Sequence, residues 1–214
     1  MRVFILCAGK AERYGGVSKQ LLTITRDGKC VLDRMIHQLK KRGIHDIWIV
    51  THNKEIEKYA NDNGINILYP ELYDITPHTA LSTRPMWTLH NLILLGDCVF
   101  SDETMDKIVL TRKNICFFGD IYDIWAVSFT DNNTAQFAFD VPVMSREKGI
   151  YYQKVRQSFR YLSGLDCSSP PSREQLEKST IFYNIDDPMT FDLDTRWEYD
   201  CAKKEYIDTG MLDF

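Results

Sequence analysis

Long hydrophobic runs are missing from this 214-residue sequence, and no stretch approaches the length that a membrane-spanning helix needs. An excess of positive charge is also missing: the formal net charge is −4 at pH 7, so no general basic surface argues for nucleic-acid binding. The six cysteines are widely spread without a C-x-x-C pair, which argues against a zinc site or a disulfide framework. We therefore expect no membrane or nucleic-acid partner, and a reducing location, the cytoplasm.

The chain also lacks internal repeats, low-complexity tracts and any stretch with the composition of a linker between domains. Hydrophobic residues make up 44% and charged residues 26%, the balance of an ordinary globular protein. The length suffices for one substantial core. These features predict a single domain over residues 1–214, and they leave a homodimer open.

What is present is concentrated at the start of the chain. Residues 3–8 form a short apolar run, which predicts a strand buried on both faces in a mostly parallel sheet. Residues 9–19 contain three glycines and three cations, Lys10, Arg13 and Lys19. Glycine lets backbone N–H groups approach a ligand, and such groups beside cations form a receptacle for phosphate. A merely solvated loop is the alternative, and the segment matches neither a P-loop nor a dinucleotide fingerprint.

Hydrophobic periodicity along the rest of the chain predicts helices that alternate with strands. Helices are expected at 31–43, 54–63, 80–82, 86–89, 103–112, 149–163, 173–177 and from 195 to about 206. Strands are expected at 46–51, 65–69, 92–100, 115–118, 125–129, 181–183 and 189–195, and 130–148 has no clear assignment. This alternation predicts an α/β fold with a mixed, mostly parallel sheet of roughly seven strands.

Two further stretches place carboxylates where a ligand would bind. Asp97 follows Gly96 at the end of a buried run, in the crevice where open α/β sheets bind ligands, and Gly96 is expected to keep the approach clear. Asp192 and Asp194 are expected on one side of a late strand, where two carboxylates repel each other unless a cation lies near them. Helix capping is the alternative role for Asp97 and for Asp194 with Thr195.

The order of these features resembles that of nucleotidyltransferases that join a nucleoside triphosphate to a sugar phosphate or similar phosphorylated alcohol. Residues 6–13 read Leu-Cys-Ala-Gly-Lys-Ala-Glu-Arg, similar to that family's Leu-Ala-Ala-Gly-x-Gly-x-Arg, and 18–22 are similar to its following Pro-Lys-x-Leu. Residues 94–100 resemble its Gly-Asp-Val/Cys-x-Phe segment, and 191–199 resemble its closing Glu-Ile-Asp-Thr-x-x-Asp-Tyr.

The resemblance implies a three-layer α/β/α fold and Mg²⁺ as the cofactor. It implies that Arg13 holds the leaving pyrophosphate and that Lys19 lies near the attacking and α-phosphate oxygens. Asp97 and Asp194 are the implied Mg²⁺ ligands, with Asp192 as a nearby helper or bystander. The residues implied to lie against the nucleotide are Leu6, Ala8, Gly9, Lys10, Ala11, Thr79, Ala80 and Ser82.

The implied reaction is transfer of a nucleoside monophosphate to a phosphorylated acceptor, such as a sugar 1-phosphate or phosphocholine, with release of pyrophosphate. A glycosyltransferase that uses a nucleotide-sugar is one alternative, with residues 192–194 as its Asp-x-Asp motif, although that motif normally lies mid-chain. A non-catalytic nucleotide-binding relative is the other. It is suggested by Ala11, where the family has glycine, and Ser18, where it has proline. Neither the base nor the acceptor is identified, and 115–180 contain no recognisable motif.

Overall fold

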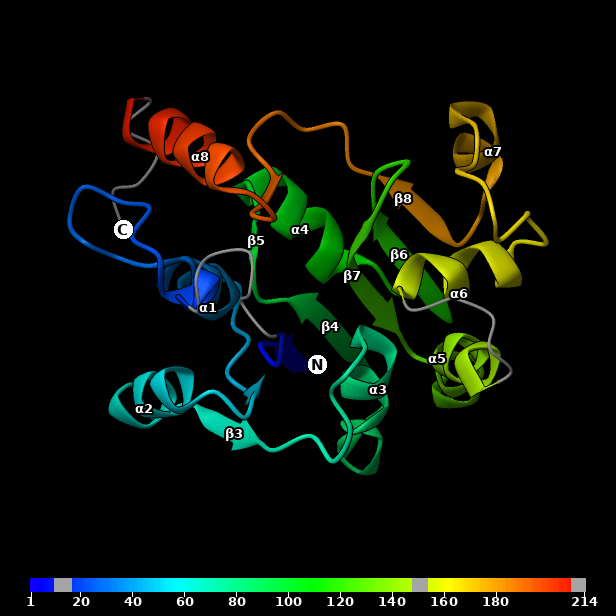
Figure 1. Ribbon diagram of the computed structural model, residues 1–214, viewed down its shortest axis with the longest axis horizontal. Coiled ribbons are helices and arrows are strands. Elements are labelled where there is room, and N and C mark those ends of the chain that lie inside the picture. Colours follow the sequence, from blue (N-terminus) through cyan, green and yellow to red (C-terminus); the bar gives the residue numbers. More distant parts are fainter. Residues whose placement is uncertain (10–16, 148–153, 209–214) are drawn as a thin grey trace.

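The computed structural model describes residues 1–9, 17–147 and 154–208, and its centre is a seven-stranded sheet (Figure 1). The strands lie in the order β3-β2-β1-β4-β7-β6-β8, with β3 and β8 at the two edges. All neighbouring pairs are parallel except those of β7, which is antiparallel to both β4 and β6. The prediction of a mixed, mostly parallel sheet is confirmed. The strand bounds are β1 Arg2–Leu6, β2 Ile47–Val50, β3 Asn66–Leu68, β4 Asn91–Leu95, β6 Ile115–Gly119, β7 Ile124–Phe129 and β8 Phe182–Asn184.

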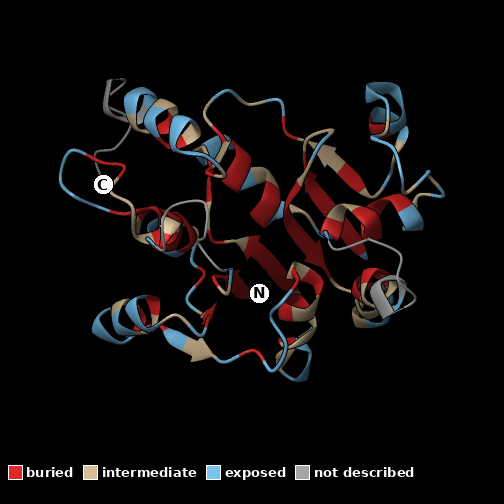
Figure 2. Ribbon diagram, viewed as in Figure 1, coloured by how far each residue is buried: buried red, intermediate tan, exposed pale blue. Residues whose placement is uncertain are grey.

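Helices cover both faces of the sheet, which makes the three layers of the fold. One face shares a hydrophobic core with α1 (Val31–Lys41), α2 (Lys54–Asp62) and α4 (Asp102–Leu110). The other face packs on α3 (Thr76–Leu81), α5 (Asn132–Glu147), α6 (Val155–Leu162) and α7 (Arg173–Lys178). A third, smaller core lies under α8 (Arg196–Asp208). Figure 2 shows the central strands buried between helices whose outer faces are exposed.

Strand β1 is buried on both faces, as the opening apolar run predicts. Val3 and Ile5 belong to the core under α1, whereas Phe4 and Leu6 belong to the core on the opposite face. Side chains alternate along a strand, so an unbroken apolar run is what a central position between two helical layers requires. β1 pairs with β2 on one side and with β4 on the other.

The segment 130–148, which has no clear assignment from the sequence, forms most of helix α5. Ala135, Ala138 and Phe139 are fully buried at helical spacing. Pro142 lies inside the helix, and an internal proline weakens the sequence signal for a helix because it removes a backbone donor. Two small alanines leave little hydrophobic periodicity to detect, so packing against α3 and α6 decides this element.

The predicted strand 92–100 is broken, and this break shapes the site. β4 ends at Leu95, the chain turns through Asp97, and β5 (Cys98–Val99) pairs antiparallel with β9 (Phe191–Asp192) in a separate two-stranded sheet. The predicted strand 189–195 is therefore only two residues long. The backbone N–H of Leu193 also donates to the carbonyl of Asp97 at 3.1 Å. Two segments far apart in the chain thus carry their carboxylates to one place.

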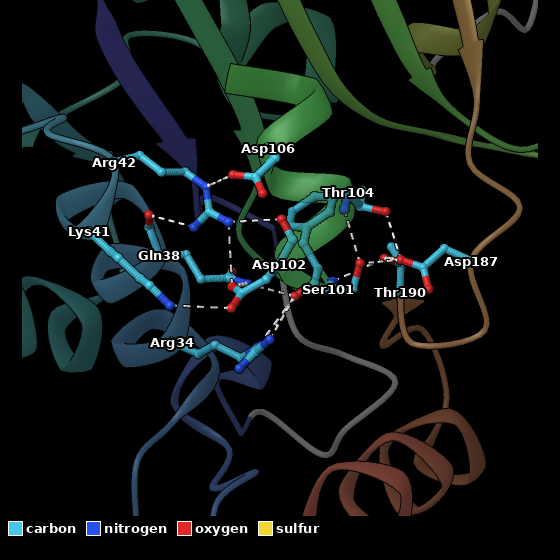
Figure 3. Close-up of polar contacts among 11 residues, drawn as sticks. Arg34, Gln38, Lys41, Arg42, Ser101, Asp102, Thr104, Asp106, Asp187 and Thr190 are labelled. Atoms are coloured by element: carbon cyan, nitrogen blue, oxygen red, sulfur yellow. Dashed lines mark hydrogen bonds and ion pairs between the residues drawn. The ribbon is translucent and has the colours of Figure 1, made fainter. Parts of the chain in front are cut away.

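Polar contacts hold the end of β5 from two sides (Figure 3). The carbonyl of Phe100 accepts hydrogen bonds from Arg34 Nη2 at 3.2 Å and Gln38 Nε2 at 3.0 Å, both from α1. On the other side, Asp187 accepts from Ser101, from Thr104 Oγ1 at 2.7 Å and from Thr190 Oγ1 at 2.8 Å. The segment that leads into β9 is thereby tied to the first turn of α4.

All six cysteines are free thiols, and Cys7, Cys98 and Cys116 are buried in the core. Within the described ranges, no helix combines the length and the apolar character that crossing a bilayer requires.

Candidate active site

A cavity of about 550 Å³ opens at the carboxyl edge of the sheet, beside the ends of β1 and β4. Its floor carries Lys19, Asp97, Asp192 and Asp194. Leu6, Ala8 and Gly9 reach it from the end of β1, and Thr79 reaches it from α3. The remaining lining residues are Gln20, Tyr73, Asp74, Ile75, Thr76, Leu95, Asp123, Ile124, Lys154, Val155 and Arg156. The cavity lies where parallel strands end, as expected for a ligand site in an open α/β sheet.

The ammonium of Lys19 joins the two carboxylates that the resemblance assigns to a metal. Nζ lies 2.7 Å from Oδ2 of Asp97 and 3.1 Å from Oδ1 of Asp194. The Lys19 side chain is only 12% exposed, so these charges interact with little screening from water. Burial alone would lower the pKa of Lys19, but the two carboxylates outweigh burial and raise it. Lys19 is therefore charged throughout the physiological range.

A short 3-10 helix, Lys19–Leu21, positions this lysine, and Ser18 anchors the start of that helix. Ser18 has φ of −67°, the angle that a proline would impose at the position where the resembling family has proline. Its buried hydroxyl donates to Glu55 Oε2 at 3.0 Å and accepts from Asn53 Nδ2 at 3.0 Å. Ser18 thus keeps the backbone angle of proline and adds a tie to the start of α2.

Asp192 lies closer to Asp97 than a bystander would. A carboxylate oxygen of each, together with Sγ of Cys98, lies within 4.8 Å of the others. Burial is the main cause that raises the pKa of Asp192 to about 8, and the charges of Asp97 and Asp194 raise it further. Lys19 opposes this shift without cancelling it. The cluster therefore holds more negative charge than one ammonium balances.

The donors present fit a hard divalent cation such as Mg²⁺. Asp97, Asp192 and Asp194 offer carboxylate oxygens, which are the ligands that Mg²⁺ prefers, alongside phosphate oxygens and water. The thiol of Cys98 is a soft donor, and burial raises its pKa well above the ordinary value, so it stays protonated. A cation among the three carboxylates would also offset the repulsion that adds to the effect of burial on the pKa of Asp192.

Gly96 has a different role from the one expected. It does not line the cavity, so it does not clear a path for a ligand. A Cβ at this position would clash with Sγ of Cys7 and come within 2.9 Å of the carbonyl oxygen of Leu6. Its backbone N–H donates to the same carbonyl at 3.0 Å. Glycine is required here because the ends of β1 and β4 approach each other closely.

The structure places the predicted nucleotide-binding residues in three groups. Leu6, Ala8, Gly9 and Thr79 line the cavity together with the three predicted charged residues, Lys19, Asp97 and Asp194. Ala80 is fully buried in the core under α3, and Ser82 lies outside the cavity with its hydroxyl donating to His78 O at 3.0 Å. Lys10, Ala11 and Arg13 lie outside the described residues.

A second wall of the cavity comes from the part of the sequence without recognisable motifs. Asp123 ends the turn that leads into β7, and Lys154 and Arg156 lie at the start of α6. β7 runs against the other strands, so its beginning lies at the edge where the parallel strands end. Asp97 can be identified from the sequence because it follows a buried strand. Asp123 precedes its strand, and nothing in the sequence shows that the direction of β7 is reversed.

Comparison with known proteins supports the fold. A search of curated proteins finds no significant match. Among solved structures, the chain is similar to a protein assigned as a glucose-1-phosphate thymidylyltransferase of Bacillus anthracis, with a TM-score of 0.65 and 12% identity over 100% of this chain and 97% of that one. The chain is also similar to the inositol-1-phosphate CTP transferase of T. maritima, with a TM-score of 0.59 and 11% identity over 96% of this chain and 97% of that one. For the CTP:phosphocholine cytidylyltransferase of Streptococcus pneumoniae, the TM-score is 0.60 and the identity is 16%, over 95% of this chain and 98% of that one.

At these identities the structural similarity establishes the fold alone. The family follows from a sequence model, which matches residues 3–117, from β1 into β6. That match spans more than half of the chain and includes the glycine-rich segment, Lys19 and Asp97. The resemblance seen in the sequence is therefore confirmed, and this chain belongs to the family of MobA-like NTP transferase domains.

Proposed function

We propose that this protein is a nucleotidyltransferase that transfers a nucleoside monophosphate from a nucleoside triphosphate to a phosphorylated small molecule, with release of pyrophosphate and a requirement for Mg²⁺. The observation that carries this proposal is the meeting of Lys19 with Asp97 and Asp194 at the floor of a cavity beside Gly9. A partly buried cation and a carboxylate cluster next to a glycine-rich segment suit a triphosphate with its metal.

In the proposed reaction, an oxygen of the acceptor phosphate forms a bond to the α-phosphorus of the triphosphate. The bond from that phosphorus to the oxygen that bridges the α- and β-phosphates breaks, and pyrophosphate leaves with its electron pair. No covalent enzyme intermediate is needed, so positioning and charge neutralisation supply the catalysis. Lys19 would neutralise charge on the attacking and α-phosphate oxygens, and its position at the cavity floor supports this role.

The remaining roles follow the family resemblance. Gly9, Lys10 and Ala11 would cradle the phosphates through backbone N–H groups, and Arg13 would hold the leaving pyrophosphate. The nucleoside would lie against Leu6, Ala8 and Thr79, which line one side of the cavity; the family assigns Ala80 and Ser82 to this side as well. When bound by Asp97 and Asp194, with Asp192 beside them, Mg²⁺ supplies charge neutralisation and orientation for the phosphates.

A screen for pyrophosphate release tests this function. The purified protein is incubated with ATP, CTP, GTP or UTP, each with Mg²⁺ and a panel of sugar 1-phosphates, inositol 1-phosphate and phosphocholine. We expect acceptor-dependent pyrophosphate release with at least one pair, and its loss in Asp97→Asn but not in the control Asp62→Asn, whose exposed carboxylate pairs with Lys58 on α2. Nucleotide binding without any release would favour a non-catalytic relative. Sugar transfer from a nucleotide-sugar would favour a glycosyltransferase.

A further inference from the structure

The second wall of the cavity carries a compact group of charges that the proposed chemistry does not use. Nζ of Lys154 lies 3.0 and 3.1 Å from the two oxygens of Asp123, and Nη1 of Arg156 lies 3.7 Å from one of them. Nη1 of Arg156 also donates to the carbonyl of Tyr122 at 2.8 Å. All three charged side chains line the cavity and are between a quarter and a half exposed. We call Asp123, Lys154 and Arg156 the charged wall.

The backbone holds the charged wall in place. Asp120 closes the turn between β6 and β7, because its carboxylate accepts from the backbone N–H groups of Tyr122 and Asp123 at 2.7 and 2.8 Å. Gly119 makes this turn possible, since a Cβ there would clash with the carbonyl oxygen of Asp123. Asp123 therefore points into the cavity from a tightly constrained turn, and a flexible loop would not fix it in this way.

The charged wall also retains unused hydrogen-bonding capacity. Nε of Arg156 is buried and has no hydrogen-bond partner among the residues that the structure describes, and a buried donor without a partner is costly. The Lys154 ammonium has a third donor beyond its two contacts with Asp123. The third donor of Lys154 is therefore available to a bound molecule, and the part of the Arg156 side chain that lines the cavity can contact one as well.

The charged wall lines the same cavity as the proposed reacting groups. Asp123 lines the same cavity as Asp192, and its charge contributes to the electrostatic environment of that carboxyl group. Thr79 and the end of β1 lie on the side proposed for the nucleoside, so the charged wall is available for the second substrate. This step rests on the proposed function.

From this geometry we infer that the charged wall selects the acceptor, and that the acceptor is a phosphate of a polyhydroxylated ring, such as a sugar or a cyclitol. A hydroxyl group both donates and accepts, so neighbouring hydroxyls can donate to the Asp123 carboxylate and accept from Lys154 and Arg156. An ion pair whose members lie side by side matches this pattern of alternating donors and acceptors.

The same charges disfavour a quaternary ammonium acceptor such as phosphocholine. Two cations and one carboxylate leave the wall with net positive charge, which repels a trimethylammonium group. Such a group neither donates nor accepts a hydrogen bond, and its usual recognition is by aromatic faces. A trimethylammonium group bound here would leave polar groups of the charged wall without hydrogen-bond partners. That loss of partners discriminates between acceptors more strongly than the charge repulsion does.

The test compares acceptors and variants at saturating triphosphate and Mg²⁺, with the triphosphate identified in the screen above. The acceptors are glucose 1-phosphate, inositol 1-phosphate, their monodeoxy analogues and phosphocholine. The variants are Lys154→Gln, Arg156→Gln and the double variant, with Arg173→Gln as control, because Arg173 is an exposed arginine of α7 in ion pairs outside the cavity. KM for acceptor, KM for triphosphate and Tm are measured for each.

We expect a hydroxylated acceptor to be preferred over phosphocholine by the wild type. We expect KM for that acceptor to rise on the order of tenfold to a hundredfold in Lys154→Gln and Arg156→Gln, while KM for triphosphate and Tm stay level. Removal of one ring hydroxyl should raise KM in the wild type and have a smaller effect in the variants. The double variant, in which Asp123 keeps its charge without its cations, should shift its preference towards phosphocholine.

A wild type that prefers phosphocholine would overturn the inference. So would variants with unchanged acceptor KM, or hydroxyl effects of equal size in wild type and variants. Turnover of phosphocholine without turnover of any hydroxylated acceptor would also overturn it, whereas triphosphate binding without turnover of any acceptor, or no triphosphate binding at all, would overturn the proposed function itself.

Discussion

The ammonium of Lys19 lies 2.7 Å from Oδ2 of Asp97, and this contact places the proposed catalytic cation directly on a proposed metal ligand. The same ammonium reaches Asp194 at 3.1 Å. One resident cation therefore compensates carboxylates that would otherwise repel each other. A metal ion among these carboxylates would compete with Lys19, so binding of a phosphate that draws Lys19 away should favour the metal.

The first prediction concerns this competition. Lys19→Met should lower the free energy of unfolding of the metal-free protein by about 1–3 kcal/mol, because a partly buried ion pair loses one partner. Mg²⁺ without nucleotide should then raise Tm more in the variant than in the wild type, since the cation takes over the compensation. Thermal unfolding in EDTA and in Mg²⁺ measures both effects. The control Lys54→Met removes an exposed lysine that pairs with Glu57. Equal Mg²⁺ responses of variant and wild type would contradict the competition.

The second prediction concerns the ligands. Asp97→Asn should lose most of the nucleotidyl transfer activity and most of the Mg²⁺-induced rise in Tm. In EDTA its unfolding free energy should stay within about 1 kcal/mol of the wild type. Lys19 keeps its ion pair with Asp194, and Asp192 no longer has the repelling charge of Asp97 beside it. Asp194→Asn and Asp192→Asn are compared in the same assays. Near wild-type turnover of Asp97→Asn would show that Asp97 is not a metal ligand. A far larger loss of activity in Asp192→Asn than in Asp194→Asn would show that Asp192, and not Asp194, is the second ligand.

The third prediction is a pH dependence of metal-free stability. The pKa of Asp192 rises from an ordinary 3.8 to about 8 in the folded protein. Between these values the folded state holds a proton that the unfolded state has released, so this group makes stability fall as pH rises, by up to about 1.4 kcal/mol per pH unit. Chemical denaturation in EDTA from pH 5 to 9 should show a shallower fall in Asp192→Asn than in the wild type. Parallel curves for the two proteins would contradict the raised pKa.

The fourth prediction concerns Asp187, which holds the segment before β9. Asp187→Asn weakens the contacts with Thr104 and Thr190, so the unfolding free energy should fall by about 1–3 kcal/mol. Misplacement of β9 should also raise the Mg²⁺ concentration needed for half of the metal-induced rise in Tm. The neighbouring Asp186→Asn, which removes only an exposed contact with Arg173, is the matched control. A stability loss with an unchanged Mg²⁺ requirement would show that Asp187 does not position the site.

The fifth prediction concerns the packing of Gly96. Gly96→Ala should cost about 1–3 kcal/mol of stability, because the new methyl group meets Cys7 Sγ in a filled space. Cys7→Ala in the same chain should recover part of that loss, so the two effects should not be additive. Denaturation of both single variants and the double variant gives the coupling. Additive losses would place the strain at the carbonyl of Leu6 instead.

The fold class, the family and much of the charged floor of the cavity follow from the order of residues along the chain. An unbroken apolar run in residues 3–8 can be satisfied only between two helical layers, and β1 lies there. Lys19, Asp97 and Asp194 were identified because they follow strands or lie in short segments whose order is shared with the family. Apolar runs and short motifs such as these depend only on residues that are close together in the sequence.

The contacts among residues that are far apart in the chain depend on the tertiary structure. Asp123 reaches the cavity because β7 is reversed, and a strand carries no sequence signal for its direction. Gly96 is required by Cys7, which directly follows the neighbouring strand β1. The raised pKa of Asp192 depends on burial and on carboxylates nearly a hundred residues apart. Such effects arise from distances across the fold, and hydrophobic periodicity, which reports only local burial, does not encode them.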